Sequence, residues 1–284
     1  MSVRIINTVM GPRGQAVLLA LAVGSSGLPL SGHAQPAEQA TLLNLHDTAI
    51  RAESAGQWDE AIRIHKIRTI VAPAAAETWV RISDIESRRG NTNAALEALA
   101  QAVNASPSNA TLHARLSQGY SMANRPKDSF ASMERAVALD PTNTVYLLSR
   151  AELANWTGQS DVAAESCERI LKLNKDDRAA LLLLARTRMW QGRLNESVVV
   201  YRKYLREHPE HAEAYLEYVK VEAWRGNFSR STKVLKEYGR AFGNPAKVDR
   251  EQARVYASAD KPDAAMALNE PLLKAAPGDV ELQF

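Results

Sequence analysis

The chain of 284 residues is long enough for one large domain or two ordinary ones, and its 45% hydrophobic content excludes a disordered chain. Its 35 Lys and Arg against 32 Asp and Glu give a formal net charge of only +3, and the single cysteine, Cys167, excludes an intrachain disulfide. Helix formers are abundant and no alternating run of β-branched residues occurs, so the chain is predicted to be all-α.

Residues 1–34 differ in character from the rest. Arg4 and Arg13 precede the apolar stretch 16–23, and Gly32-His33-Ala34 places small residues where a signal peptidase reads them. This pattern predicts a cleavable secretory signal, followed by a short linker at 35–41. An amphipathic helix or a membrane anchor is the alternative, although the apolar stretch is short for a bilayer span.

Removing the predicted signal takes away Arg4 and Arg13 and no acidic residue, which leaves 33 Lys and Arg against 32 Asp and Glu. A nearly neutral mature chain argues against binding to nucleic acid through bulk charge. We therefore expect an exported protein of the periplasm or outer membrane without a nucleic-acid partner.

From Leu42 onward the sequence repeats every 34 residues without insertion or deletion. The seven predicted units are 42–75, 76–109, 110–143, 144–177, 178–211, 212–245 and 246–279, and residues 280–284 resemble the start of an eighth.

Three columns of this alignment predict the fold of each unit. One column contains only residues that tolerate a left-handed backbone, as the end of a helix requires: Gly56, Gly90, Asn124, Gly158, Gly192, Gly226 and Asp260. A second contains only small residues, which allow two helices to cross closely: Ala61, Ala95, Ser129, Ala163, Ser197, Ser231 and Ala265. A third ends the second helix, mostly with proline: Pro73, Pro107, Pro141, Lys175, Pro209, Gly243 and Pro277.

Each unit thus reads helix, tight turn, helix, loop, with apolar residues at helical spacing. The pattern resembles the tetratricopeptide repeat over residues 42–279, with Lys175 and Gly243 as departures at the loop proline. This resemblance implies a right-handed α-solenoid in which the first helices line a concave groove.

The groove columns implied by the resemblance contain the candidate site. Trp156, Trp190 and Trp224 recur at the 34-residue interval and form what we call the tryptophan column. Four residues earlier, one helical turn away, is the column Glu152, Arg186, Lys220 and Arg254, whose last member precedes Ser258. Lys247 and Arg250 add positive charge in the seventh unit. Arg186 and Lys220 are each expected to make a cation–π contact with the tryptophan four residues later.

The tryptophan column has two interpretations. The indoles could pack between adjacent units, or they could bind a ligand in the groove. Arg88 and Met122 occupy the same column in the second and third units, whereas a packing requirement would be expected in every unit. An extended polysaccharide or a peptide with apolar anchors and acidic groups would suit such a surface.

The chaperone-tail clamp known for some members of this family is not expected. It needs Lys and Asn in particular groove columns of the first units. Those columns contain His46, Val80 and Ala114 and then Ile50, Asp84 and Gln118.

The sequence suggests no catalytic residue, metal site or cofactor. His208-Pro209-Glu210-His211 spans a predicted loop without a third ligand nearby, and Cys167 falls in a column that faces the partner helix. We therefore expect a non-enzymatic protein.

Exported arrays of this kind resemble the periplasmic portions of exopolysaccharide exporters, such as the cellulose-secretion subunit and the poly-N-acetylglucosamine porin. In those families the repeats precede an outer-membrane barrel and bind synthase partners or the polymer, so partner proteins and a polysaccharide are both implied as ligands. The alternatives are a periplasmic assembly factor that binds only proteins or peptides, and a repeat domain fused to an enzyme beyond Phe284.

Overall fold

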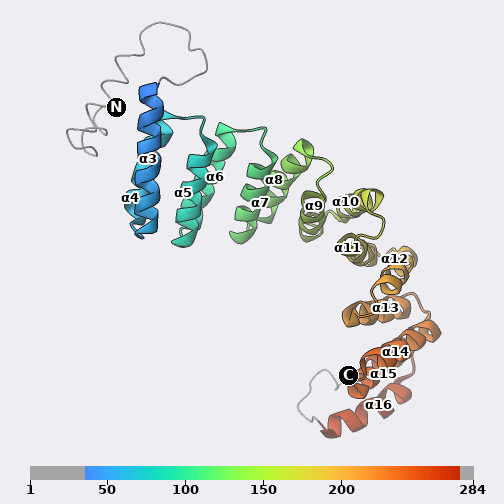
Figure 1. Ribbon diagram of the computed structural model, residues 1–284. Helices are drawn as coiled ribbons and strands as arrows, with labels where there is room; N and C mark the ends of the chain where they lie inside the picture. The colour runs from blue at the N-terminus through green and yellow to red at the C-terminus, as the bar shows by residue number, and fades with distance from the viewer. Residues whose placement is uncertain (1–35, 276–284) are drawn as a thin grey trace. The chain divides into compact units, whose positions relative to one another are not determined.

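The computed structural model describes residues 36–275, which form α-helices joined by short turns and contain no strand (Figure 1). The predicted signal at 1–34 and the predicted start of an eighth unit at 280–284 lie outside the described residues. The all-α prediction is confirmed for the part of the chain that is described. None of its helices is both long and apolar enough to cross a membrane.

The chain divides into two compact units at Pro107 and Ser108. The helices of the N-terminal unit are α3 (Pro36–Ser54), α4 (Trp58–Val71), α5 (Ala76–Arg88) and α6 (Thr92–Ala105). Those of the C-terminal unit are α7 (Ala110–Met122), α8 (Pro126–Leu139), α9 (Thr144–Trp156), α10 (Ser160–Leu173), α11 (Arg178–Trp190), α12 (Leu194–Glu207), α13 (Ala212–Trp224), α14 (Phe228–Phe242), α15 (Pro245–Ser258) and α16 (Pro262–Ala275).

Each odd-numbered helix packs against the even-numbered helix that follows it, as in a row of helical hairpins (Figure 1). Within each unit the second helix of one hairpin also packs against the first helix of the next. In the C-terminal unit α9 contacts α11, and α13 contacts α15, so first helices also meet one another. This is an α-solenoid of helix-turn-helix repeats; its right-handed superhelical sense remains a prediction.

The tight turn inside each hairpin depends on one residue with positive φ. All seven predicted turn residues have φ between 54° and 79°, including the non-glycine residues Asn124 and Asp260. In the fifth repeat the amide of Gly192 donates to the carbonyl of Met189 at 3.0 Å, and that of Arg193 donates to Arg188 at 2.9 Å. These bonds satisfy carbonyls that the helix end would otherwise leave unpaired, and the left-handed residue makes them possible.

The column of small residues is buried throughout, as the sequence predicts. Where serine stands in it, the hydroxyl has a fixed acceptor on the first helix. Ser129 donates to the carbonyl of Ser117 at 2.8 Å, and Ser197 donates to that of Ala185 at 2.8 Å. A small polar residue is therefore compatible with the crossing point because its hydroxyl is hydrogen-bonded.

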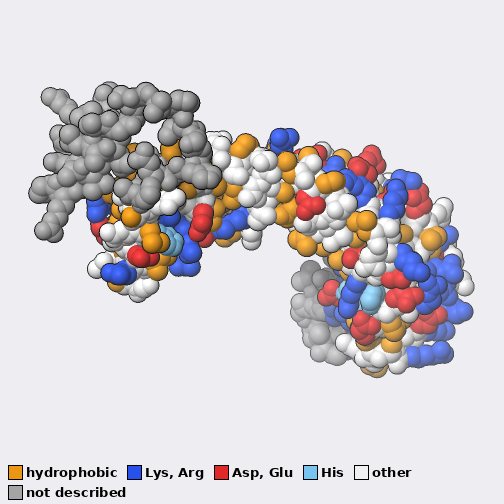
Figure 2. All heavy atoms as spheres, turned by 45° about the horizontal axis from the view of Figure 1, so that its top comes forward, with side chains coloured by type: hydrophobic (Ala, Val, Ile, Leu, Met, Phe, Trp, Pro, Cys, Tyr) orange, Lys and Arg blue, Asp and Glu red, His pale blue; other side chains and the backbone are white. Residues whose placement is uncertain are grey.

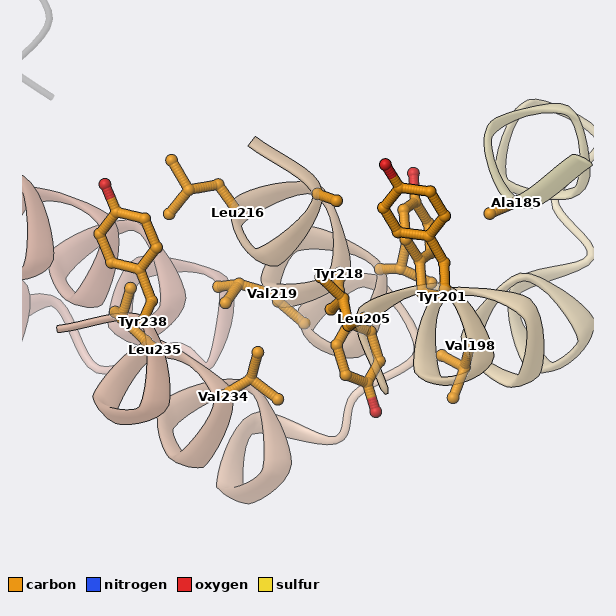
Figure 3. Packing of buried hydrophobic residues seen from close by; sticks show 14 of the residues in the cluster. Ala185, Val198, Tyr201, Leu205, Leu216, Tyr218, Val219, Val234, Leu235 and Tyr238 are labelled. Atoms are coloured by element: carbon orange, nitrogen blue, oxygen red, sulfur yellow. The ribbon is translucent and has the colours of Figure 1, made fainter. Parts of the chain in front are cut away.

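The largest apolar cluster lies in the C-terminal unit, over helices α11 to α15. In Figure 3, Leu216 and Val219 of α13 lie between Tyr201 of α12 and the α14 residues Val234 and Tyr238. One helix thus contributes to the packing on both sides, which is how neighbouring hairpins share a core.

The aromatic residues of the N-terminal unit pack in a different way. Trp58 of α4 and Trp79 of α5 are partly buried against Ile62, Ile82 and Ile85. Both indoles therefore contribute to hairpin packing, which distinguishes them from the tryptophan column.

The helix ends follow the predicted breakers. Helices α4, α6, α8 and α12 end two residues before Pro73, Pro107, Pro141 and Pro209, respectively.

The prediction of a linker at 35–41 needs correction, because α3 already begins at Pro36. Proline is well tolerated at the first helical position, and the following Ala, Glu and Gln residues are strong helix formers.

His65 of α4 is fully buried in the N-terminal unit. Its Nε2 lies 2.7 Å from a carboxylate oxygen of Glu53, whereas its Nδ1 is buried without a hydrogen-bond partner. Burial lowers the pKa of His65 below the ordinary 6.5; Glu53 opposes this shift, and Arg68 and Arg81 reinforce it. Neutral His65 is therefore the form that suits the fold.

Replacing Gly192 by Ala tests the turn. Nothing lies within 4 Å of an added Cβ, so the cost is backbone strain at φ 72° alone. We expect Gly192→Ala to lower the free energy of unfolding by about 1–2 kcal/mol, measured by urea denaturation. Gly192→Asn is the matched control and should cost less, because Asn124 adopts the same conformation. Equal losses for the two variants would contradict the role of positive φ.

The buried imidazole predicts acid sensitivity. Because the pKa of His65 is lower in the folded chain than the ordinary 6.5, its contribution to stability is complete above that value and is lost as the pH falls below it. As the pH falls from 7.5 to 5.5, we expect the free energy of unfolding to decrease by at most about 1.4 kcal/mol per pH unit. His65→Gln should flatten this slope. Fluorescence of Trp58 and Trp79, with the tryptophan column replaced by Phe, reports on this unit. Parallel curves for the two proteins would contradict the prediction.

Candidate functional site

The first helices of the sixth and seventh repeats line an open hollow of about 570 Å³, which we call the α13–α15 hollow. Helix α13 contributes Val219, Lys220, Ala223 and Trp224, and α15 contributes Glu251, Arg254, Val255 and Ser258. Val219, Ala223 and Val255 are buried and form an apolar floor, whereas Lys220 and Ser258 are exposed. The volume falls within the range of about 300–1,000 Å³ typical of ligand pockets.

Each residue of the tryptophan column is the last residue of a first helix and ends α9, α11 or α13. Trp156, Trp190 and Trp224 keep 55%, 58% and 59% of their surface accessible. Packing between repeats therefore accounts for less than half of each indole surface, so packing alone does not explain the column. Binding of a ligand by these side chains remains a prediction.

The cation–π contact predicted for Arg186 is not found. Its guanidinium instead holds the carboxylate of Glu217 on α13, with Nε 3.0 Å from both oxygens and Nη2 2.9 Å from Oε1. Lys220 does not lie over an indole either: among the described residues the cation–π contact is Arg125 over the ring of Tyr120, at 4.6 Å. The ion pair prevails because a charge-assisted bidentate hydrogen bond is stronger than an exposed cation–π contact.

Glu217 lies at the centre of a small, partly buried network. The hydroxyl of Tyr201 on α12 donates to Glu217 Oε2 at 3.0 Å. Burial and the charge of Glu217 raise the pKa of Tyr201, so it stays a phenol and a donor. Burial alone would lower the pKa of Arg186, but its hydrogen bonds to Glu217 raise it. The groove cation of the fifth repeat is therefore neutralised within the protein.

The equivalent carboxylate of the next repeat, Glu251, behaves differently. It accepts from Arg254 Nη1 at 2.6 Å, three residues later on its own helix. In both repeats the carboxylate pairs with an arginine: Glu217 with Arg186 of the preceding first helix, and Glu251 with Arg254. Arginine prevails over lysine because its planar fork matches a carboxylate. As a result, Lys220 makes no ion pair with any residue in the range 36–275.

The predicted site residues thus separate into two groups. Trp224, Lys220 and Arg254 meet in the α13–α15 hollow. Lys247 and Arg250 precede Arg254 by seven and four residues on α15, with Lys247 exposed and Arg250 half-buried. Trp156, Trp190 and Arg186 lie on α9 and α11 and do not line the hollow. Positive and negative side chains are interspersed on the face of the C-terminal unit shown in Figure 2.

Sequence reasoning missed the acidic residues of the site. Glu217 and Glu251 stand 34 residues apart, so the repeat alignment contained the signal. Ser258 was visible as the small residue that follows Trp224 in the tryptophan column. The apolar floor could not be distinguished from ordinary core positions in the sequence.

Cys167 and the two histidines of the loop 208–211 are packed against other side chains of the protein. Cys167 is completely buried, as its column predicts, and burial raises the pKa of its thiol to about 12. His211 Nδ1 lies 2.6 Å from the hydroxyl of Tyr204, and the ring of His208 packs on that tyrosine. Within the described part of the chain, no group of three His, Cys, Asp or Glu residues is arranged to hold a metal ion.

Comparison with known proteins agrees with this geometry. The family model of the tetratricopeptide repeat matches residues 80–144 and 148–212. Similar solved structures include the MamA protein, with 20% identity, a TM-score of 0.55, and coverage of 61% of this chain and 94% of that one. A tetratricopeptide repeat protein from Parabacteroides merdae ATCC 43184 has 15% identity, a TM-score of 0.54, and coverage of 85% and 96%.

A third similar structure is YrrB, described as a tetratricopeptide repeat protein with an unusual peptide-binding site. It has 16% identity, a TM-score of 0.55, and coverage of 65% of this chain and 95% of that one. No match was found among curated proteins. Residues 80–144 and 148–212 thus match the tetratricopeptide repeat family, whose repeats generally serve as scaffolds for protein–protein interaction, and the similar structures share its fold.

Truncating the tryptophans tests whether the column packs. We expect Trp190→Ala and Trp224→Ala each to change the free energy of unfolding by less than about 1 kcal/mol, since most of each indole is already in water. Trp79→Ala, which removes a packed indole, should cost about 3 kcal/mol. Urea denaturation of the three variants gives the comparison. A large loss of stability in both column variants would show that these indoles are structural.

Proposed function

We propose that this protein is a non-catalytic, exported scaffold that holds a partner protein against the first helices of its C-terminal unit. The observation that carries the proposal is the tryptophan column, in which three indoles more than half exposed recur at the repeat interval. An exposed aromatic side chain with a polar rim is a common anchor of protein interfaces. The peptide-binding site named for the similar YrrB supports a peptide or protein as the ligand class.

A polysaccharide is the second candidate ligand, and the same three indoles favour it. Each exposes an aromatic face on which the apolar face of a sugar ring can pack. In this candidate the protein takes part in the secretion of an exopolysaccharide of a biofilm matrix. Export to the periplasm or outer membrane is part of both candidates and rests on the signal pattern of residues 1–34.

The partner proposal is tested with two matched variants. The first replaces Trp156, Trp190 and Trp224 by Ala. The control replaces Leu173 and Val199 by Ser; both are exposed apolar residues, but they lie on second helices. Affinity capture from a periplasmic extract of the native host, with quantitative mass spectrometry, should show proteins that the first variant loses and the control retains.

Two further measurements complete the test. Equal capture by both variants would contradict the proposed role of the tryptophan column. Binding of cellohexaose to the wild type, lost in the tryptophan variant, with no difference in captured proteins, would favour the polymer. N-terminal sequencing of the protein from intact cells tests export, with cleavage after Ala34 expected.

A further inference from the structure

The α13–α15 hollow exists because the sixth and seventh repeats differ from their neighbours at a few equivalent positions. Three junctions join first helices of successive repeats: α9 contacts α11, α13 contacts α15, and the Arg186–Glu217 ion pair connects α11 and α13. Because the repeat has a constant length of 34 residues, corresponding side chains can be compared directly across the three junctions.

The first two junctions are bridged by polar interactions within the protein. At α9–α11, Asn155 Nδ2 donates to Thr187 Oγ1 at 2.8 Å. At α11–α13, Arg186 holds Glu217, and Met189 occupies the place of Asn155. In both cases polar or bulky side chains of one first helix are engaged with the next.

The third junction lacks these features. Ala223 stands where Met189 and Asn155 stand in the preceding repeats, and Ser258 stands where a fourth tryptophan would continue the column. Lys220 stands in the place of Arg186, but the carboxylate opposite, Glu251, is held by Arg254. Two small residues therefore leave space, and Lys220 is left without a counter-charge among residues 36–275.

The chemistry of the walls defines what fits this space. The face of Trp224 and the buried floor of Val219, Ala223 and Val255 suit an apolar or aromatic side chain. Lys220 stands beside this floor, where a carboxylate would be attracted more strongly than in open water. Arg254, which is exposed and paired with Glu251, also lines the hollow.

We propose that the α13–α15 hollow binds a peptide segment of the partner in which an acidic residue lies next to an aromatic or large apolar one. The carboxylate lies against Lys220, and the apolar side chain lies between Trp224 and Ser258. A neutral polysaccharide fits less well, because it offers no carboxylate to Lys220 and would place hydroxyls against the apolar floor. This inference rests on the proposed function and adds the chemistry of the ligand.

The test is a peptide titration of the full, isotopically labelled chain. Binding is monitored through the indole N–H signals in NMR spectra. The probe is the capped peptide acetyl-Glu-Phe-Asp-Leu-amide, and the matched neutral probe is acetyl-Gln-Phe-Asn-Leu-amide. Trp224→Phe assigns the signal of the hollow. We expect the acidic peptide to shift this signal. The neutral peptide should bind roughly tenfold more weakly, because it cannot form the charged hydrogen bond between a probe carboxylate and a cation of the protein.

Three variants test the walls. Ala223→Met and Ser258→Trp copy the residues found 34 positions earlier, so they should fill the hollow and abolish the shift while leaving the melting temperature unchanged. Lys220→Gln should weaken the acidic peptide roughly tenfold and leave the neutral peptide unaffected. Lys236→Gln, the same change at an exposed lysine of α14, should have no effect.

Several results would overturn the inference. These are equal affinity for the acidic and neutral peptides, a larger Trp224 shift with cellohexaose than with the acidic peptide, no shift with either peptide, or unchanged binding in Ser258→Trp. A different result would contradict the proposed function itself: partner capture that persists after all three tryptophans are replaced. Lost capture together with an unchanged titration in Ser258→Trp would overturn the ligand chemistry alone.

Discussion

The structure depends on a backbone constraint that recurs in every repeat: one residue must adopt positive φ so that the second helix can fold back on the first. Gly192 illustrates it, with φ 72° and hydrogen bonds that close the end of α11. Because this turn fixes where the second helix starts, the crossing point always falls on the same later residue, which must be small. Ser197 meets this requirement and donates its hydroxyl to the first helix. The hydrophobic cores between hairpins follow from these two positions.

The same constraint explains why a tryptophan can occupy the end of a first helix without entering the core. The residue two positions before the turn glycine faces away from the partner helix, so its side chain can vary without affecting the hairpin. Trp190 and Trp224 lie there and stay more than half exposed, whereas Trp79, earlier in its helix, packs against isoleucines. Fold and surface chemistry are thus specified by different residues of one repeat, which lets successive junctions differ while the backbone remains the same.

Much of the fold could be predicted from the sequence because repetition shows what each position tolerates. The turn, crossing and helix-ending columns each reflect a backbone or steric limit that applies in every unit, and the structure satisfies them. The site was predictable only in part. Lys220, Trp224 and Arg254 were identified from their columns, but the partners of Glu217 and Glu251 depend on which arginine is within reach, and that distance is a property of the packed helices. The linker assignment failed because polar helix formers after Pro36 carry no apolar periodicity.

The hydrogen-bonded turn after each first helix has a consequence for the energetics of binding. A ligand that contacts a side chain on a mobile loop must also order that loop, and the lost conformational entropy weakens association. Trp224 is instead the last residue of a helix whose end is fixed by hydrogen bonds from Gly226 and Asn227 to Ala223 and Glu222. Only its two side-chain torsions remain to be restricted, so most of the contact made by the indole is available as binding free energy. Glycines that no ligand touches thus contribute to affinity by keeping an exposed aromatic ring in place.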